Sequence, residues 1–203
     1  RLTDNVFEIA LSRPDGFDFL PGQWIRLFFE GASRDYSLVS TPDHPELVFC
    51  VRQVTGGRVS PLLAAADKGE PLSISGPHGY FVYKSSDRRA VFAATGAGIA
   101  PFVSMARSGI AGFILLHGVR TRDDLIYEDV VSAKAAQYIP CLSEPGQNAA
   151  GVFPGRVTDF MDAHLPPGDY DFYLCGRSEM IRDATLVADE RFPDALVHAE
   201  IFY

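Results

Sequence analysis

Short apolar runs, separated by turn-forming residues, dominate the first part of the chain. The β-prone runs lie at residues 6–11, 23–29, 34–38, 47–54 and 71–75. The turn residues between them are Pro14-Asp15-Gly16, Pro21-Gly22, Gly31, Pro42-Asp43 and Gly56-Gly57. Many short strands separated in this way are typical of a closed or sandwiched antiparallel sheet. A single helix is expected among them, at residues 60–66.

The pattern changes after a polar link at residues 84–89, where apolar strand-like runs begin to alternate with helical ones. Strands are predicted at residues 90–94, 113–119, 138–142, 171–174 and 196–201. Helices are predicted at residues 100–107, 129–135, 156–164 and 178–191. Alternation of this kind, with continuously apolar strands, predicts a parallel sheet covered by helices on both faces. We therefore expect two domains, at residues 1–86 and 87–203.

Composition narrows the class of protein. The 203 residues carry a net charge of -8, which argues against a nucleic-acid binder because phosphate contacts need clustered Lys and Arg. No apolar run approaches the roughly 20 residues of a membrane-spanning helix. The widely spaced Cys50, Cys141 and Cys175 favour reduced thiols in the cytoplasm over a disulfide framework. They also fall short of the about four thiolate ligands that an iron–sulfur centre needs.

No metal site is predicted from the histidines. His78, His117 and His198 are dispersed, without a ligand spacing such as H-E-x-x-H, and we interpret them as structural or surface residues. Asp123-Asp124 and Glu128-Asp129 are most simply solvated or capping carboxylates. A Ser-His-Asp arrangement is not evident either.

A glycine-rich block joins the first strand and the first helix of the second domain. Thr95-Gly96-Ala97-Gly98-Ile99-Ala100-Pro101 follows the strand predicted at 90–94 and opens the helix predicted at 100–107. Glycines at such a turn let the backbone approach a pyrophosphate, whose charge the helix N-terminus stabilises. Pro101 fits the first helical turn, where a missing N–H costs nothing. An ordinary tight turn between a strand and a helix looks similar, so this block alone leaves both interpretations open.

Two further turns are expected at the same edge of the parallel sheet. Leu174-Cys175-Gly176-Arg177-Ser178-Glu179-Met180 again ends a strand at a glycine and begins a helix, and His117-Gly118-Val119-Arg120 ends another strand. The carboxyl edge of an open α/β sheet is where ligands bind. The alternative for Cys175 is a small buried apolar residue, the usual role of a free cysteine.

The first domain offers two anion-binding candidates. Arg34-Asp35-Tyr36-Ser37 combines a cation, an aromatic ring able to stack on a planar group, and a hydroxyl able to bond its edge. Arg58-Val59-Ser60 follows Gly56-Gly57 at the start of the expected helix, where backbone amides are suited to a second pyrophosphate. The alternative for Tyr36 is packing within the sheet.

Taken together, these blocks resemble the ferredoxin–NADP reductase superfamily over essentially the whole chain. Five motifs occur in the family's order. They are residues 34–37 (family pattern R-x-Y-S), 76–81 (G-P-x-G-x-F), 95–101 (T-G-x-G-I-A-P), 175–180 (C-G-x-x-x-M) and the terminal Glu200-Ile201-Phe202-Tyr203. The resemblance implies a six-stranded antiparallel FAD-binding β-barrel followed by an α/β nicotinamide-nucleotide domain with a five-stranded parallel sheet.

The resemblance also implies roles for individual residues. Arg34 would contact the flavin pyrophosphate, Tyr36 would pack against the isoalloxazine, and Ser37 would lie near flavin N5. The predicted cofactor-binding set around them is Asp35, Cys50, Val51, Arg52, Arg58, Val59 and Ser60. The predicted dinucleotide set is Thr95, Gly96, Ala97, Gly98, Ile99, Ala100, Pro101, Gly118, Arg120, Cys175, Gly176 and Met180. Cys175 would lie beside the nicotinamide, Glu200 matches the family's acidic position, Phe202 its ring-stacking aromatic, and Tyr203 is an added aromatic reaching towards the adenine side.

The implied activity is hydride transfer from NAD(P)H to FAD, with Ser37, Cys175 and Glu200 as the catalytic residues. Electrons then pass to a protein acceptor, which the sequence leaves open among ferredoxin, flavodoxin and an oxygenase component. One alternative is a reductase module of a larger complex, and another is a flavin-holding regulatory or interaction subunit with weak turnover.

The choice between NADH and NADPH depends on the residues after the third parallel strand. Relatives that use NADPH often carry Ser-Arg there, whereas this chain has Ser143-Glu144. A glutamate repels a 2′-phosphate and suits ribose hydroxyls better. Arg120 and Arg156 remain as possible phosphate partners. We favour NADH.

Overall fold

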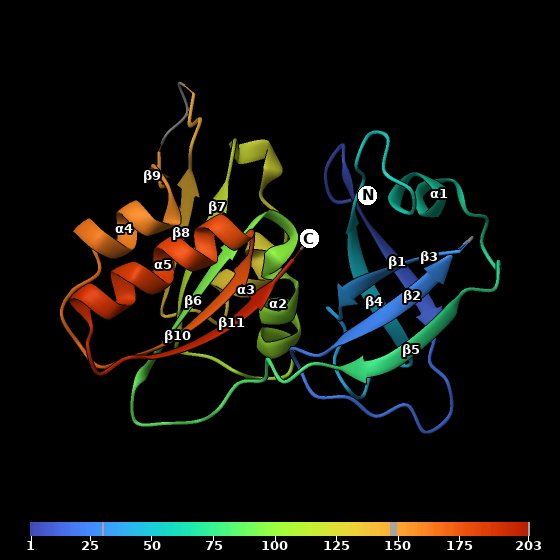
Figure 1. Ribbon diagram of the computed structural model, residues 1–203, viewed down its shortest axis with the longest axis horizontal. Helices are drawn as coiled ribbons and strands as arrows, with labels where there is room; N and C mark the ends of the chain where they lie inside the picture. Colours follow the sequence, from blue (N-terminus) through green and yellow to red (C-terminus); the bar gives the residue numbers. More distant parts are fainter. Residues whose placement is uncertain (30, 147–149, 203) are drawn as a thin grey trace.

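The first part of the chain folds into two small antiparallel sheets. The computed structural model describes residues 1–29, 31–146 and 150–202. Strand β1 (Val6–Ser12) pairs with β4 (Glu46–Arg52), and β2 (Trp24–Phe29) lies between β3 (Ala32–Ser37) and β5 (Ser73–His78). Helix α1 (Ser60–Ala65) packs beside them. We call these elements the antiparallel half (Figure 1).

The expected six-stranded barrel is wrong in its count and closure, because the described residues contain five strands in two sheets. The sheets meet at one isolated bridge between Leu38 and Phe49. At this point the Leu38 N–H donates to Gln23 and the Val39 N–H donates to Val48, so the chain passes from one sheet to the other. Alternate residues of β2 and β4 still point inwards, and Ile25, Leu27, Leu47 and Phe49 make one apolar core.

The second part is the expected parallel α/β sheet, which we call the parallel half. Its strand order is β11-β10-β6-β7-β8-β9, and every pairing is parallel. The strands are β6 (Arg89–Thr95), β7 (Ile114–Val119), β8 (Gln137–Leu142), β9 (Phe153–Pro154), β10 (Tyr170–Gly176) and β11 (Leu196–Ile201). The expectation of five strands is corrected to six within the described residues. The additional strand, β9, has two residues, too few to give a periodic signal.

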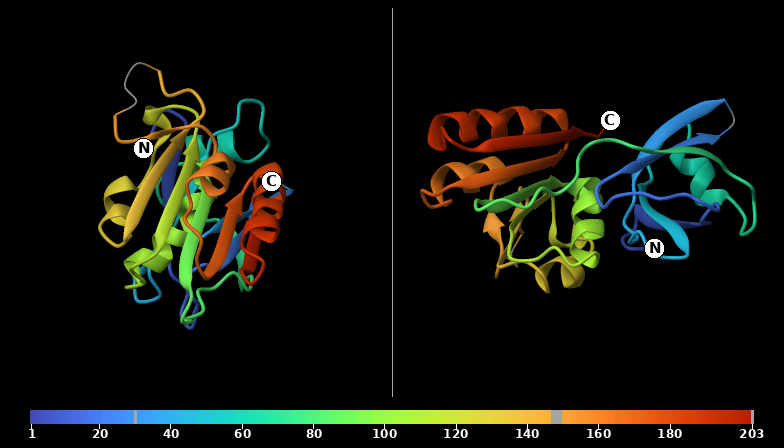
Figure 2. Two further views of the ribbon diagram at one scale, coloured as in Figure 1. Left: turned by 90° about the vertical axis from the view of Figure 1, so that its left-hand side faces the viewer. Right: turned by 90° about the horizontal axis from the view of Figure 1, so that it is seen from below.

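Helices cover both faces of this sheet (Figures 1 and 2). They are α2 (Ala100–Arg107), α3 (Glu128–Ser132), α4 (Val157–Ala163) and α5 (Ser178–Arg191), with short 3₁₀ turns η1 (Gly96–Ile99) and η2 (Arg122–Asp124). Helices α4 and α5 pack on one face, whereas α2 and α3 pack on the other. All seven residues of β10 are buried, as expected for a central parallel strand. In the described part of the chain, no helix is both long and apolar enough to cross a membrane.

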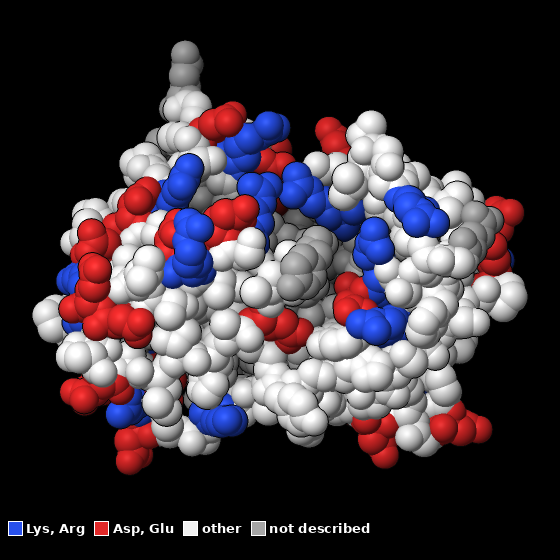
Figure 3. All heavy atoms as spheres, viewed as in Figure 1, with Lys and Arg blue, Asp and Glu red and all other residues white. Residues whose placement is uncertain are grey.

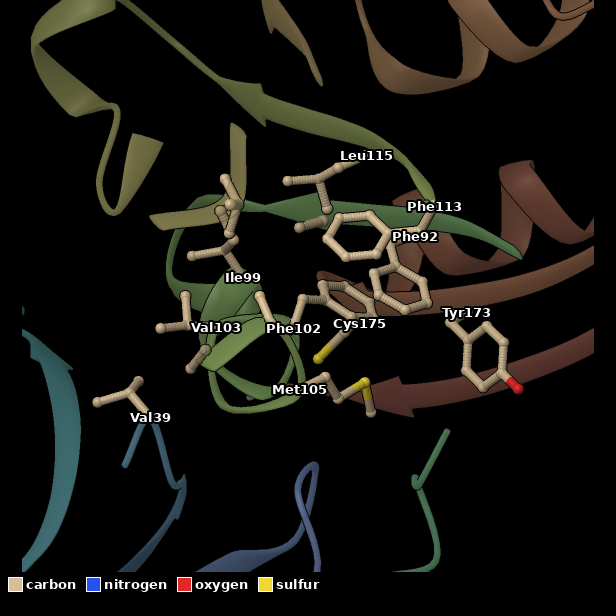
Figure 4. Close-up of a cluster of buried hydrophobic side chains, with 14 of the residues drawn as sticks. Val39, Phe92, Ile99, Phe102, Val103, Met105, Phe113, Leu115, Tyr173 and Cys175 are labelled. Atoms are coloured by element: carbon tan, nitrogen blue, oxygen red, sulfur yellow. The ribbon is translucent and has the colours of Figure 1, made fainter. Parts of the chain in front are cut away.

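One apolar cluster runs through both halves. Val6, Val39 and Cys50 of the antiparallel half pack in the same cluster as Phe102 and Val103 of α2. Figure 4 shows Val39 facing Val103 across the junction, with the rings of the parallel half stacked behind them. Burial of this shared surface stabilises one arrangement of the two halves because separating them would expose apolar side chains to water.

At the carboxyl edge of the parallel sheet, two backbone segments touch directly. A Cβ atom built on Gly98 would lie 2.5 Å from the carbonyl oxygen of Cys175 and 2.8 Å from the Cα of Gly176. A Cβ on Gly176 would lie 2.1 Å from Thr95 Oγ1, and the φ of Gly176 is +142°. Glycine is therefore required at both positions, and the turn after β6 rests on the end of β10.

Replacing Gly98 with alanine is expected to destabilise the folded state by about 1–3 kcal/mol, because the new methyl group meets backbone atoms that cannot move independently. Chemical denaturation of the purified protein measures this loss. Ala97→Ser is the control, since the neighbouring position already carries a Cβ. Equal unfolding midpoints for Gly98→Ala and Ala97→Ser would contradict the close contact.

Candidate functional site

Ser37 ends strand β3 with a buried hydroxyl. The residue is 2% exposed, and within the described chain Ser37 Oγ makes no hydrogen bond. A buried hydroxyl without a partner is costly and marks a place where a bound group or water completes the bonding. Of the side chains predicted for the flavin site, Ser37 therefore carries the clearest structural signal.

The other residues of the same strand have different environments. The Tyr36 ring stacks on Phe49 at 5.0 Å between centroids, and burial raises the pKa of its hydroxyl to about 12. Asp35 is held by Arg26 in a two-pronged ion pair of 2.7 and 2.9 Å. Arg34 is exposed and donates to the Ser33 carbonyl, so its guanidinium is on the surface beside Tyr36.

The predicted backbone contacts lie on the open edge of β4. Cys50 and Val51 are buried, whereas Arg52 is exposed. Beyond the Leu38–Phe49 bridge, β4 pairs with β1 on one side and with no named strand on the other. Backbone groups on that second side are thus available to a ligand, as the resemblance implies.

The hydroxyl of Ser60 forms a hydrogen bond within the turn that precedes α1. Ser60 Oγ accepts from the Val54 N–H at 2.9 Å, which closes the turn around Gly57. Val59 is buried and gives the helix no side-chain cap, and Arg58 is exposed next to it. Arg58 and the backbone of the first helical turn are therefore the anion-facing groups here.

The glycine-rich block forms the turn that the sequence predicts. It leaves β6 at Thr95, makes the 3₁₀ turn η1 and enters α2, whose first turn contains Pro101. Ile99, Ala100 and Pro101 point into the core, so only their backbone is available to a ligand. Thr95 Oγ1 accepts from the Arg177 N–H at 3.0 Å and joins this turn to the one after β10.

A buried histidine supports the same turn from below. His117 Nε2 lies 3.1 Å from the Gly96 carbonyl oxygen, and Nδ1 lies 3.3 Å from the Tyr138 hydroxyl. Burial lowers the pKa of His117 to about 4, so the ring is neutral at pH 7 and Nε2–H donates to Gly96. This is a structural role, in agreement with the sequence interpretation.

Cys175 and Glu200 are paired in register on neighbouring strands β10 and β11. Burial, and then the neighbouring Glu200, raises the pKa of Cys175 well above its usual value. Burial, and then Asp35, raises the pKa of Glu200 to about 7. The Oε2 atom of Glu200 is buried without a hydrogen-bond partner among the described residues. Because the charge of Asp35 raises the pKa of Glu200, we assign the end of β3 and the end of β11 to the same site.

The chain end closes over this region. The Phe202 N–H donates to the Gly176 carbonyl at 2.9 Å, and its side chain packs against the shared core cluster. Tyr203, the added aromatic residue of the prediction, lies outside the described residues. Figure 3 shows a hollow between the two halves, with basic side chains along its upper side.

The segments predicted to select the nucleotide meet at the ends of β7 and β8. The Ser143 N–H donates to Val119 and the Glu144 N–H to Arg120. Arg120 Nε lies 3.8 Å from Glu144 Oε2, with side chains 70% and 66% exposed. Gly118 is close to Thr95, since a Cβ there would lie 3.3 Å from the threonine methyl.

Two other predicted residues lie further from this meeting point. The exposed Arg156 precedes α4, and its N–H donates to Asp159. Met180 is buried among the apolar side chains beneath α4 and α5, so its side chain stabilises the parallel half. The sequence analysis missed Ser104, Arg107 and Tyr127, which join the two halves. The available signal was a serine at position 104 among the apolar residues 100–106 of the helix Ala100–Arg107.

Two family matches cover most of the chain. Residues 3–83 match the oxidoreductase FAD-binding domain and residues 92–185 match the oxidoreductase NAD-binding domain. The electron transfer component of toluate 1,2-dioxygenase from Pseudomonas putida is 33% identical over 177 residues, which are 80% of this chain and 52% of that protein. The chain thus spans about half the length of the first curated relatives that it matches.

Solved structures give the same fold. A cytochrome P450 reductase from Amycolatopsis is 26% identical with a TM-score of 0.85, covering 100% of this chain and 66% of that one. A ferredoxin NADP+ reductase from Neisseria gonorrhoeae, solved with bound FAD and NADP, is 23% identical with a TM-score of 0.84, covering 98% and 93%.

One relative is matched over most of its own length. Ferredoxin–NADP reductase B from Sorangium cellulosum is 33% identical over 183 residues, which are 81% of this chain and 73% of that protein. Both nucleotide-binding domains of the family are present, in the family's order. The chain therefore belongs to the ferredoxin–NADP reductase family.

Proposed function

We propose that this chain transfers hydride from NADH or NADPH to bound FAD and delivers the electrons to a protein acceptor, either a ferredoxin, a flavodoxin or an oxygenase component. The observation that carries the proposal concerns the five buried polar side-chain atoms that have no hydrogen-bond partner among the described residues. Two of them, Ser37 Oγ and Glu200 Oε2, belong to predicted site residues, one from each half. The names of the relatives support it, because they include oxygenase reductases and electron transfer components.

The antiparallel half fits FAD. The unpartnered Ser37 hydroxyl, the Tyr36 ring and the open edge of β4 would hold the flavin ring. The exposed Arg34 and Arg58 would hold the pyrophosphate. When bound, FAD accepts two electrons and can release them one at a time.

The parallel half fits a nicotinamide nucleotide. The turn at residues 95–101 would present backbone N–H groups at the carboxyl edge of the sheet. Gly96, which has no atom within 4 Å of a Cβ placed on it, would let a pyrophosphate approach, whereas Gly98 serves the contact with β10. Gly118, Arg120 and Gly176 border the same edge. Ser143 and Glu144 would face the adenosine ribose.

Cys175 and Glu200 would line the place where the two ligands meet. Because its pKa is raised, Cys175 remains a thiol and acts by packing and weak hydrogen bonding. Glu200 exchanges its proton near neutral pH, since its pKa is about 7, and can hold or move a proton at Oε2. Phe202 would cover the flavin until the nucleotide displaces it.

The organisation of the chain belongs to the same proposal. We place the FAD-binding domain at residues 1–86 and the nucleotide-binding domain at 87–203, with the link near 84–89. Three buried free thiols, Cys50, Cys141 and Cys175, support a cytoplasmic location. A second candidate is the reductase module of a larger complex, which is supported by relatives named as the electron transfer component of a dioxygenase and the reductase component of a monooxygenase.

Anaerobic mixing of the FAD-loaded protein with each nucleotide tests the proposal and the choice of donor. We expect NADH to bleach the flavin absorbance, with a higher kcat/KM than NADPH, because Glu144 repels a 2′-phosphate and engages Arg120. Glu144→Gln should lower the ratio of kcat/KM for NADH to that for NADPH roughly threefold, which is the effect of removing one exposed charge. Glu190→Gln, an exposed position near the C-terminal end of α5, is the control. A protein that neither nucleotide reduces would contradict the function, and a large NADPH preference would contradict only the choice of donor.

Ser37→Ala is expected to slow flavin reduction roughly fivefold, the equivalent of one lost hydrogen bond, with little loss of bound FAD. Stopped-flow absorbance gives the rate, and the flavin-to-protein absorbance ratio gives the FAD content. Ser33→Ala, on the same strand, is the matched control. An unchanged reduction rate in Ser37→Ala would refute the role assigned to the hydroxyl.

Glu200→Gln is expected to change how the stability of the apoprotein depends on pH. The folded-state pKa of about 7 lies above the ordinary value of 4.5, so the folded state binds this proton more tightly than the unfolded state. Stability from this group is present below about pH 4.5 and is lost as the pH rises through 7. The free energy of unfolding should be measured at pH 5 and pH 8. Relative to wild type, Glu200→Gln should be more stable at pH 8 than it is at pH 5. Glu46→Gln is the control. If stability depended on pH in the same way in wild type and Glu200→Gln, the raised pKa of Glu200 would be contradicted.

A further inference from the structure

Helix α2 lies between the two halves and touches a candidate ligand site at its beginning and the other half near its end (Figure 1). It starts at Ala100, directly after the glycine-rich turn, and ends at Arg107. Eight helical residues span about 12 Å. Its apolar side chains join the shared core, with Val103 facing Val39 (Figure 4).

A buried hydrogen bond crosses the junction from the middle of this helix. Ser104 is 0% exposed, and its Oγ donates to the Ser40 carbonyl at 2.7 Å. Ser40 is itself buried and accepts from the Val48 N–H through its own hydroxyl. Alanine would suit a buried helical position better than serine, so the hydroxyl has a specific purpose, which is to hold Ser40.

Arg107 repeats this contact three residues later. Its Nη1 donates to the Val39 carbonyl at 2.9 Å, and its guanidinium carbon lies 5.5 Å from the centroid of the Tyr127 ring. The Tyr127 hydroxyl donates to Glu8 Oε1 at 2.9 Å. Ser104 and Arg107 therefore donate hydrogen bonds to two consecutive carbonyls of the antiparallel half. Tyr127 connects Arg107 to β1 through its ring contact with the guanidinium and its hydrogen bond to Glu8.

Val39 and Ser40, whose carbonyls accept these bonds, continue the chain just after the candidate flavin strand β3. Val39 follows Ser37 by two residues, and its N–H is fixed by the Val48 carbonyl. A displacement of Val39 or Ser40 would move the end of β3 relative to η1. The same helix thus connects Ser37 to the turn that is suited to the dinucleotide.

We propose that Ser104 and Arg107 are positioning residues that set the separation between Ser37 and the glycine-rich turn, and thereby the rate of hydride transfer. This inference rests on the proposed function. Arg107 is exposed over much of its side chain, so its bonds contribute little to global stability. Its main effect is on geometry, where a shift of about 1 Å costs up to a hundredfold in rate.

Arg191 provides a matched control, because it makes the same types of contact within the parallel half alone. Its Nη1 donates to the Met161 carbonyl at 2.7 Å, and its guanidinium carbon lies 5.2 Å from the Phe192 ring centroid. Arg191 also donates to the Leu165 carbonyl at 3.3 Å and lies 4.0 Å from Asp162. Arg191→Met therefore loses at least as many contacts as Arg107→Met does, but leaves the junction intact.

The experiment compares wild type, Arg107→Met, Ser104→Ala, Arg107→Lys and Arg191→Met. In the FAD-loaded proteins we expect Arg107→Met and Ser104→Ala to slow flavin reduction by NADH on the order of tenfold, with KM for NADH and FAD content within about twofold of wild type. Arg107→Lys should recover part of the rate because an ammonium group can still donate to Val39. Arg191→Met should reduce at the wild-type rate.

A second measurement uses the apoproteins. Hydrogen exchange of the peptide covering residues 38–48 should accelerate in Arg107→Met and Ser104→Ala and stay at the wild-type rate in Arg191→Met, because only the first two loosen Val39 and Ser40. Wild-type rates of reduction and exchange in both junction variants would overturn the inference and leave the proposed function intact. A wild type that neither NADH nor NADPH reduces would instead overturn the proposed function, and the inference with it.

Discussion

The backbone of the glycine-rich turn rests directly on the end of β10, with no space for a side chain between Gly98 and Cys175. This contact brings the carboxyl ends of two neighbouring strands together. The hydrogen bond from the Arg177 N–H to Thr95 then fixes the turns that follow them. Since Glu200 is paired with Cys175, the same contact also sets where the acidic group lies. The nucleotide-facing edge is therefore shaped by close packing of the backbone, with side chains added around it.

The second constraint is the apolar core that the two halves share. Phe102 and Val103 pack with Val39 and Cys50 (Figure 4), so the halves are held together by the same burial that stabilises each of them. Most buried polar atoms in folded proteins are satisfied. Ser37 and Glu200 are two of the five residues in the described chain that carry a buried polar side-chain atom without a partner, and both are predicted site residues. The unpaired buried atoms lower the stability of the folded protein, and a ligand that bonded to them would restore it.

The regular part of the fold could be predicted because each central strand is a continuous apolar run and each turn has its own residue type. The two-residue strand β9 could not, since it has no period, and neither could the open pairing at Leu38 and Phe49. Motif residues such as Thr95 and Gly98 were found because they lie in one short run of sequence, although the contacts that they make, with Arg177 and Cys175, are distant in the chain. Ser104 and Arg107 were missed because their partners lie more than 60 residues away in the chain. The bond from Arg26 to Asp35 was missed because it depends on the register between β2 and β3.

Charge in the site is controlled by neighbours, although the whole chain is acidic. Cys175 and Glu200 lie side by side and burial disfavours ionisation of both, so a single carboxyl proton decides the local charge near pH 7. Asp35 adds a negative charge nearby, but its two bonds to Arg26 offset part of it. An exposed ion pair of this kind contributes little to stability, yet here it limits how strongly Asp35 repels the Glu200 carboxylate. The pair Arg26–Asp35 therefore matters for the protonation of Glu200, and through it for the charge that an incoming nicotinamide would meet.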